Sequence, residues 1–421
     1  MKHIIKILLP ALMLAFALPA AAQSPAAEFK FYKNQAASAD KKMLEALAQS
    51  LQFFIARHAD SPQAGEALLL KADTELKLKN FPAAAITLLR YKFEHGQPPK
   101  DMIAAAAKGL EKDKRTAFER LANANITSAE LQPNLALFLA KATELDLKNT
   151  LAPLIAQYEQ FFVRFPAFEN NDRLELMQGD LYRQNASPRA AVMQYLKVYE
   201  VYPSTKFKAA ALRMAGDVYG GDLKDYAQSM HYYEKVLKEY PTSAERGITY
   251  KHMAIMEENR KKYAPAADYA GKAADIFIKD GAAQKAYEAL FYKADLQETR
   301  LKDYPAAIAT LDRAANLFAN NQAWFVETKL KTAAIYGKKL KDPYGQIKAY
   351  ESIISAYPRA PQAIQVMFDT GQLYEKTNNP PKAKAIYQKL IVEYPADAMA
   401  NKAQKRIDAI DKKAAKEGSK N

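Results

Sequence analysis

The sequence predicts an all-α protein built as a solenoid of antiparallel helix pairs. A nine-residue pattern of aromatic and apolar residues occurs five times, and the prolines that close the copies are separated by 37, 38, 117 and 37 residues. Since 117 is three steps of 39, the copies share one period, and a period of this size is typical of stacked two-helix units. No segment keeps the alternation of apolar and polar residues that would indicate a strand.

Each copy of the pattern predicts the buried face of one helix. An aromatic residue comes first, apolar residues follow three and four positions later, and an aromatic–proline pair closes the copy. Residues at i, i+3, i+4 and i+7 lie on one helix face, and the proline disfavours helical backbone at the residue before it. The copies begin at Tyr158, Tyr195, Tyr233, Tyr350 and Tyr387 and end at Pro166, Pro203, Pro241, Pro358 and Pro395.

A second set of prolines predicts where the second helix of each pair begins. Proline is accepted in the first turn because the N–H that it lacks has no partner inside the helix. The prolines at such positions are Pro82, Pro188, Pro265, Pro305 and Pro381. The segment from Pro62 to Pro395 then divides into nine intervals of about 33 to 40 residues.

These signals divide the chain into six segments. We expect a signal peptide over 1–22, an N-terminal extension and first helix over 23–62, partly degenerate helical repeats over 63–166, regular repeats over 167–395, a capping helix over 396–411 and a basic disordered tail over 412–421. In the extension, 23–40 should be frayed and an amphipathic helix should run from about Lys41 to Arg57. A capping helix is expected because the last repeat otherwise leaves its apolar face open.

Two repeats share the spacing of six residues, at offsets 0, 3, 12, 16, 19 and 24. They are Gly179, Tyr182, Ala191, Tyr195, Val198 and Pro203 in one repeat, and Gly371, Tyr374, Ala383, Tyr387, Leu390 and Pro395 in the other. This spacing resembles the tetratricopeptide repeat (TPR). The resemblance implies a right-handed superhelical solenoid in which Gly and Ala let two helices approach closely and the aromatic residue fills the space opposite. A HEAT-like solenoid, with a period of about 40–47 residues, is the alternative.

The start of the chain has the composition of a signal peptide. Lys2 and Lys6 precede sixteen uncharged residues, 7–22, which end in Ala20-Ala21-Ala22. This combination of a positive start, an apolar run and small residues predicts export and cleavage after Ala22. A membrane anchor, the alternative interpretation, needs about 20 apolar residues. We therefore expect a periplasmic protein, either free or peripherally associated with the outer membrane, and the long repeat is similar to that of exported TPR proteins of Gram-negative envelopes.

Composition limits the partners that we expect. The chain has no cysteine, so we expect that it contains no disulfide and carries no thioether-linked lipid. Its formal net charge is +14, and an exported chain of this charge could bind an anionic envelope polymer. The alternative, which we favour, is that lysines spread through every repeat keep a large solenoid soluble. We expect no nucleic-acid partner.

The sequence contains no constellation that predicts catalysis, a metal site or a cofactor. The histidines after the signal peptide are His58, His95, His231 and His252, and no pair has the i, i+4 spacing of a helical zinc site. Glu257 and Glu258 are adjacent, so on a helix they point about 100° apart and cannot flank one bond. We expect a protein that is not an enzyme.

The TPR resemblance implies a partner-binding groove lined by the first helix of each pair. Acidic residues follow the small residue of several repeats, and basic residues occupy the same wall. The candidate groove residues are Arg173, Asp180, Arg183, Arg213, Asp217, Lys251, Glu288 and Asp295. A row of Arg and Lys there would favour an acidic segment of a partner. The alternative is that each Asp bonds to a neighbouring repeat or faces solvent.

We therefore expect an exported, non-enzymatic scaffold or adaptor that mediates protein–protein interactions at the bacterial envelope. The alternative is a protein that binds an envelope polymer, peptidoglycan or polysaccharide, or that assists an enzyme acting on it.

Small-angle scattering tests the solenoid. Because each repeat of a solenoid contacts only its neighbours, the stack cannot close into a globule. A compact protein of about 399 residues would have a radius of gyration near ~21 Å. We expect a clearly larger value, and a value within a few ångströms of the compact one would contradict the solenoid.

Overall fold

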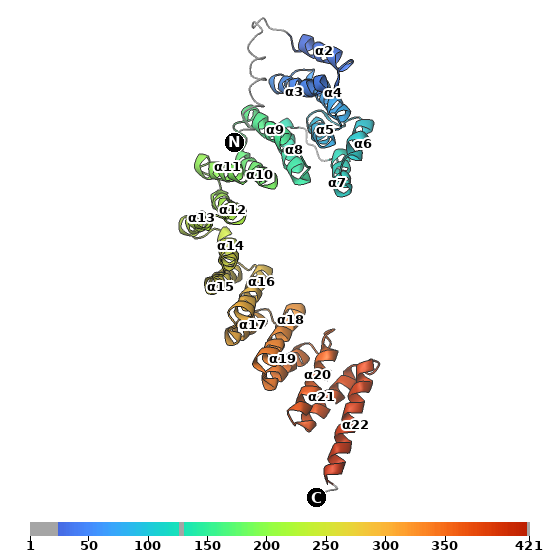
Figure 1. Ribbon diagram of the computed structural model, residues 1–421, viewed down its shortest axis with the longest axis vertical. Helices are drawn as coiled ribbons and strands as arrows, with labels where there is room; N and C mark the ends of the chain where they lie inside the picture. The colour runs from blue at the N-terminus through green and yellow to red at the C-terminus, as the bar shows by residue number, and fades with distance from the viewer. Residues whose placement is uncertain (1–23, 126–129, 419–421) are drawn as a thin grey trace. The chain divides into compact units, whose positions relative to one another are not determined.

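The computed structural model describes residues 24–125 and 130–418, which form two compact units, Met1–Ala211 (unit 1) and Leu212–Asn421 (unit 2). The described residues are helical and contain no strand, which confirms the all-α prediction (Figure 1). The predicted signal peptide lies outside the described residues. None of the described helices combines the length and the apolar composition needed to cross a bilayer.

Unit 1 contains five helix pairs and the beginning of α12. Its helices are α2 (Pro25–Ala36), α3 (Lys41–Arg57), α4 (Ala64–Lys77), α5 (Phe81–His95), α6 (Lys100–Lys108), α7 (Lys112–Asn123), α8 (Leu131–Leu145), α9 (Leu151–Arg164), α10 (Asn171–Gln184) and α11 (Pro188–Val201). α3 has the bounds expected from its apolar spacing. α2 was expected to be frayed, and this expectation is wrong: Ser24 caps it, and Phe29 is buried against Phe54 with ring centroids 5.8 Å apart.

Unit 2 continues with helices that pack in chain order. They are α12 (Lys208–Gly221), α13 (Tyr226–Glu239), α14 (Glu245–Asn259), α15 (Tyr263–Lys279), α16 (Ala283–Asp295), α17 (Tyr304–Leu317), α18 (Gln322–Ala334), α19 (Pro343–Ala356), α20 (Ala363–Lys376), α21 (Pro380–Glu393) and α22 (Ala398–Gly418). From α13 to α22 each helix packs against the next one, as expected of stacked pairs.

Two first helices of unit 2 end in a wider π-helical turn, η1 (Leu296–Arg300) after α16 and η2 (Ile335–Leu340) after α18. The sequence from Ala333 to Pro358 is one residue longer than the repeat pattern. A π-turn accommodates one additional residue inside a helix without breaking it. The repeat spacing is therefore restored by η2, and the apolar face of α19 keeps its register.

The terminal helix is longer than the sequence indicated. We expected a capping helix to end near 411 and a disordered tail to follow, but α22 continues to Gly418. Ala400, Ala403 and Ile407 are buried and perform the expected capping. Beyond Ile410 the sequence is Asp-Lys-Lys-Ala-Ala-Lys-Glu, and Ala, Lys and Glu are strong helix formers. The helix therefore extends past its last packed residue.

Most turns inside the helix pairs share one backbone feature. The residue two positions before the second helix adopts a left-handed conformation, although none of these residues is glycine. The residues are Lys79, Asn149, Ala186, Lys224, Lys261, Lys302, Lys341 and Asn378, with φ between 54° and 62°. A left-handed residue lets the chain reverse within a few residues. The second helices then begin with the prolines that the sequence marked, such as Pro82 in α5 and Pro188 in α11.

A glycine and a tyrosine join the two helices of several pairs. A Cβ atom added to Gly179 would lie 2.3 Å from Tyr195 Cε1, and one added to Gly371 would lie 2.3 Å from Tyr387 Cε1. Both tyrosine rings are completely buried. Gly216 and Tyr233 repeat this arrangement. We call these three contacts the Gly–Tyr joints, and they confirm that a small residue permits close approach opposite an aromatic ring.

Unit 1 departs from neighbour-to-neighbour packing at α5. Every residue from Ala83 to Arg90 is buried, so this helix is covered on all sides. α8 packs directly against α5, although the pair α6–α7 lies between them in sequence. α6 and α7 are only 9 and 12 residues long and cannot cover α5 alone. The pair α8–α9 therefore folds back onto α5.

Replacing Gly371 by alanine should destabilise unit 2 by about 1–3 kcal/mol, because the new methyl group overlaps a buried ring. The matched control is Gly271→Ala in α15, where the new methyl would meet only the flexible end of Lys293. Urea unfolding followed by fluorescence of Trp324, the only tryptophan, reports on unit 2. Equal midpoints for the two variants would show that the Gly–Tyr joint does not limit helix approach.

Candidate functional site

The predicted groove residues lie on four first helices, as the repeat register required. The residues Arg173, Asp180 and Arg183 lie on α10 in unit 1, and Arg213, Asp217, Lys251, Glu288 and Asp295 lie on α12, α14 and α16 in unit 2. Arg173 and Arg183 are exposed. Contacts that hold helices together involve Asp180, Arg213, Asp217, Lys251, Glu288 and Asp295.

Acidic groups of the groove accept hydrogen bonds from the buried tyrosines. The Tyr195 hydroxyl donates to Asp180 Oδ1 at 2.7 Å, and the Tyr233 hydroxyl donates to Asp217 Oδ1 at 2.8 Å. A buried hydroxyl without a partner would cost about 1–3 kcal/mol, so each carboxylate stabilises its joint. Burial raises the pKa of Tyr233, and the charge of Asp217 raises it further.

In unit 2 the predicted groove residues also connect successive repeats. Arg213 lies 2.5 Å from Asp217 of its own helix and 2.6 Å from Glu245 at the start of α14. His252 Nδ1 lies 2.5 Å from Asp217 Oδ1. Arg213 is only 16% exposed in its side chain, so this network resembles a clamp between repeats more than an open binding wall.

Asp295 and Lys251 are shared between repeats in the same way. Lys331 of α18 lies 3.0 Å from Asp295 and 2.9 Å from Glu298, and Lys251 lies 3.8 Å from Glu288. The geometry therefore favours the alternative in which acidic groove residues bond to the neighbouring repeat. Across 24–125 and 130–418, no group of three or more His, Asp or Glu side chains could hold a metal ion.

A cavity that sequence reasoning missed opens in unit 1. It has a volume of about 540 Å³ and lies between α3, α5, α8 and α9. Its floor includes Phe138 and Leu139 of α8, both 1% exposed. Two large apolar side chains stand exposed where it opens: Phe53 of α3 at 54% and Val163 of α9 at 83%. A cavity of this size with an apolar lining is typical of a binding site.

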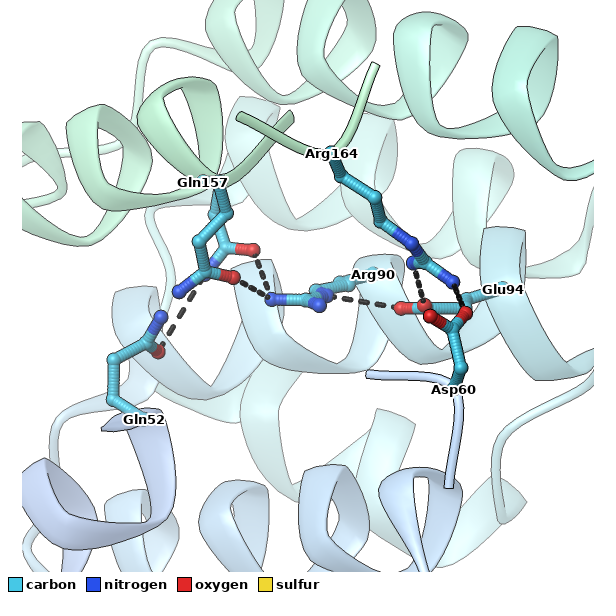
Figure 2. Close-up of polar contacts among 7 residues, drawn as sticks. Gln52, Asp60, Arg90, Glu94, Gln157 and Arg164 are labelled. Atoms are coloured by element: carbon cyan, nitrogen blue, oxygen red, sulfur yellow. Dashed lines mark hydrogen bonds and ion pairs between the residues drawn. The ribbon is translucent and has the colours of Figure 1, made fainter. Parts of the chain in front are cut away.

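Arg90 of α5 crosses one side of this cavity and is 5% exposed. Its Nη1 donates to Gln157 Oε1 at 2.5 Å and to Gln160 Oε1 at 2.7 Å on α9, and its Nε donates to Glu94 Oε2 at 3.0 Å (Figure 2). Gln157 in turn donates to Gln52 Oε1 of α3 at 3.5 Å. Arg90 therefore links the central helix to the outer wall of the cavity.

Arg164, the last residue of α9, completes the cluster. Its Nη1 donates to Glu94 Oε1 at 2.8 Å, and its Nη2 donates to Asp60, which follows α3 (Figure 2). Two guanidinium groups thus meet two carboxylates, and the formal charges cancel. We call Gln52, Asp60, Arg90, Glu94, Gln157, Gln160 and Arg164 the polar cluster.

Burial and charge compete at Glu94, whose side chain is 3% exposed. Burial alone would raise its pKa, but the charges and hydrogen bonds of Arg90 and Arg164 outweigh burial, and the pKa is lowered from its usual 4.5. Burial lowers the pKa of the adjacent His95 below 6.5, although the charge of Glu94 partly opposes this effect. Glu94 is thus held ionised and His95 neutral.

The arrangement offers apolar contact and shape rather than reaction chemistry, because its buried charges are satisfied by one another. The sequence does contain a weak signal for the cavity. Phe53 adjoins the buried Phe54, and Val163 adjoins Phe161 and Phe162, so the apolar stripes of α3 and α9 are wider than one core face needs. Nothing in the periodicity shows that these two helices meet across α5.

Comparison with protein families identifies the repeats. Tetratricopeptide-repeat models match residues 44–99, 210–243 and 365–397. The chain therefore contains tetratricopeptide repeats, which confirms the interpretation of its spacing over the HEAT-like alternative. Tetratricopeptide repeats indicate a scaffold for protein–protein interaction, and proteins built from them are generally not catalytic. No curated protein matches the chain.

Solved structures that resemble the chain are repeat proteins at low identity. The C-terminal part of a TPR repeat-containing protein from Cytophaga hutchinsonii is 14% identical, with a TM-score of 0.39, over 63% of this chain and 98% of that one. A tetratricopeptide repeat protein from Parabacteroides merdae is 13% identical, with a TM-score of 0.34, over 65% and 97%. A Rap protein complexed with competence and sporulation factor is 13% identical, with a TM-score of 0.34, over 93% and 98%.

Unit 1 should lose stability in acid through Glu94 and His95. A lowered folded-state pKa means that the stabilisation is present above the unfolded pKa and is lost as pH falls. The loss should begin below about 6.5 for His95 and below about 4.5 for Glu94. Glu94→Gln should weaken unit 1 by about 3 kcal/mol at neutral pH and flatten the acid-dependent loss, because the buried Arg90 loses its carboxylate partner and Arg164 loses one of its two.

Hydrogen exchange of α5 and α9, corrected for intrinsic rates, measures this effect. Glu66→Gln is the matched control, since Glu66 forms an exposed pair with Lys33 and should change stability by at most about 1 kcal/mol. Trp324 fluorescence follows unit 2 in the same samples. If the amides of α5 are equally protected from hydrogen exchange in the Glu94→Gln and Glu66→Gln variants at every pH, the polar cluster does not stabilise unit 1.

Proposed function

We propose that this protein is an exported, non-enzymatic scaffold or adaptor that binds partner proteins in the bacterial periplasm or at the envelope. The observation that carries the proposal is the set of tetratricopeptide repeats, whose helices pack through the Gly–Tyr joints. In such a stack the main chain is satisfied inside the helices, so side chains on long helix surfaces remain to contact partners.

Three features of composition support the envelope setting. Residues 1–22 have the charge, apolar run and small residues of a signal peptide. The chain lacks cysteine, which avoids unwanted disulfides in an oxidising compartment. Its sequence pI of about 9.3 gives it a positive charge that suits the anionic surfaces of an envelope.

The contacts of the ionisable side chains support a scaffold rather than an enzyme. Carboxylates at the Gly–Tyr joints accept hydrogen bonds from tyrosine, and several carboxylates pair with a basic side chain of a neighbouring repeat, as Glu245 and Asp295 do. Asp217 accepts a hydrogen bond from Tyr233 of its own helix pair, pairs with Arg213 of its own helix and contacts His252 of the next repeat. Groups committed in this way hold the repeats in register, which is what a scaffold needs.

Export is tested by the intact mass of protein from a periplasmic fraction. We expect a chain that begins at Gln23. Ala22→Phe should block cleavage, because a small residue is needed next to the cleaved bond, whereas Ala21→Phe occupies the tolerant middle position and should be cleaved. Full-length protein, or protein recovered only from the cytosol, would contradict export.

The scaffold role is tested by lysine-directed cross-linking in intact cells, followed by identification of the products. A scaffold should give products with two or more distinct envelope proteins at separate repeats. Enrichment of peptidoglycan fragments or polysaccharide without a protein partner would instead favour the polymer-binding alternative.

A further inference from the structure

We propose that the unit 1 cavity is the docking site for an amphipathic helix of a partner protein. The apolar face of that helix would insert between Phe53 of α3 and Val163 of α9. This inference rests on the proposed scaffold function and specifies where one partner binds. It places the site on second helices, α3, α5 and α9, together with α8, and not on the first-helix wall that the repeat resemblance implied.

The first argument concerns the size of the occupant. Phe53 and Val163 are 54% and 83% exposed and stand at the mouth of the cavity, whereas Phe138 and Leu139 form its buried floor. A small molecule that filled about 540 Å³ would contact Phe53 and Val163 only on the sides that line the cavity and would leave the rest of these exposed side chains in water. An occupant that covers both mouth residues and also reaches the floor must be larger, as a side chain carried by a docked segment is.

The second argument concerns the conformation of the occupant. The walls of the cavity are α-helices, whose main-chain N–H and C=O groups already bond to each other. The walls therefore offer no strand edge to which an extended peptide could add. A helix satisfies its own main chain and contributes only side chains, so a helix laid between α3 and α9 suits these walls.

The third argument concerns charge. Arg90 and Arg164 are both bonded to Glu94, and Arg164 is also bonded to Asp60, so the polar cluster is neutral as a whole. A charged group inserted beside it would be desolvated without a partner, at a substantial cost. The inserted face must therefore be uncharged.

The rim gives the complementary requirement. The carboxylate of Glu159 is exposed at the edge of the cavity, whereas Asp60 is bonded to Arg164 and Arg57 to Glu28. A basic residue beside the apolar face would meet Glu159. The partner helix that fits is thus apolar on the inserted face and basic along the edge that lies next to Glu159.

Site-specific photo-cross-linking in cells tests the proposal with the full chain. Val163 is replaced by the photoreactive residue benzoylphenylalanine, and the matched control carries it at Val392. Val392 is 77% exposed and has the same position in its repeat, five residues after the buried tyrosine, but it does not line the cavity. We expect an adduct at 163 whose cross-linked peptide lies in an amphipathic helical segment of another protein.

The variant Phe53→Ser, made in the photoreactive chain, should lower the yield of this adduct about tenfold, as the loss of one anchor residue at a binding hot spot does. Phe53 is exposed, so the fold should be retained, and circular dichroism checks this. As a matched control, Met193→Ser removes another exposed apolar side chain of unit 1 and should leave the yield unchanged.

Several results would overturn the proposal. One is that no adduct forms at 163, or that the adduct there is with a second copy of this chain, with lipid or with glycan. Another is that the same partner is captured equally at 392. A third is that Phe53→Ser leaves the yield of the adduct at 163 unchanged.

The proposed function is tested separately. If no partner is captured at the cavity but envelope proteins are cross-linked at other repeats, the docking site is wrong and the scaffold proposal is still supported. Recovery of the chain from the cytosol alone would contradict export without affecting the cavity.

Discussion

The close approach of two helices over a glycine is the constraint on which the regular repeats depend. At Gly179, Gly216 and Gly371 the space that a Cβ would occupy is taken by a tyrosine ring of the second helix. The buried ring brings a hydroxyl into the interior, and this hydroxyl must find an acceptor. A carboxylate on the first helix supplies it, so packing and polar satisfaction are solved by the same pair of helices.

The acceptor varies while the joint stays constant. Tyr195 and Tyr233 donate to the Asp that directly follows the glycine, whereas Tyr387 donates to Glu375, one turn later at 2.7 Å. The longer Glu side chain reaches the same hydroxyl from one turn further along the helix. This explains how Gln372 can follow Gly371, where an Asp follows Gly179 and Gly216, without loss of the joint.

The sequence predicted the structural features that recur among the repeats, but it could not predict the contacts that occur only once in the chain. The spacing of Gly179 and Tyr195 identified their contact, and the prolines identified helix starts, because these are local effects that recur. The left-handed residues before the second helices escaped prediction, since most are lysines, which give no signal for that conformation. The polar cluster escaped it for another reason: Arg90 and Gln157 lie 67 residues apart, and no periodic pattern links them.

The fold-back in unit 1 follows from the composition of α5 and has a consequence for binding. From Ala83 to Leu89 every residue of α5 except Thr87 is apolar, so the helix must be covered around its circumference there. The two short helices α6 and α7 could not do this alone, and the pair α8–α9 packs against α5 as well. The cavity is what remains between α3 and α9, and the polar cluster holds these walls through buried bonds to Arg90 and Glu94. A site whose walls are already fixed loses little conformational entropy when it is filled. The feature that breaks the regularity of the repeats is thus also the one that can present a preformed surface to a partner.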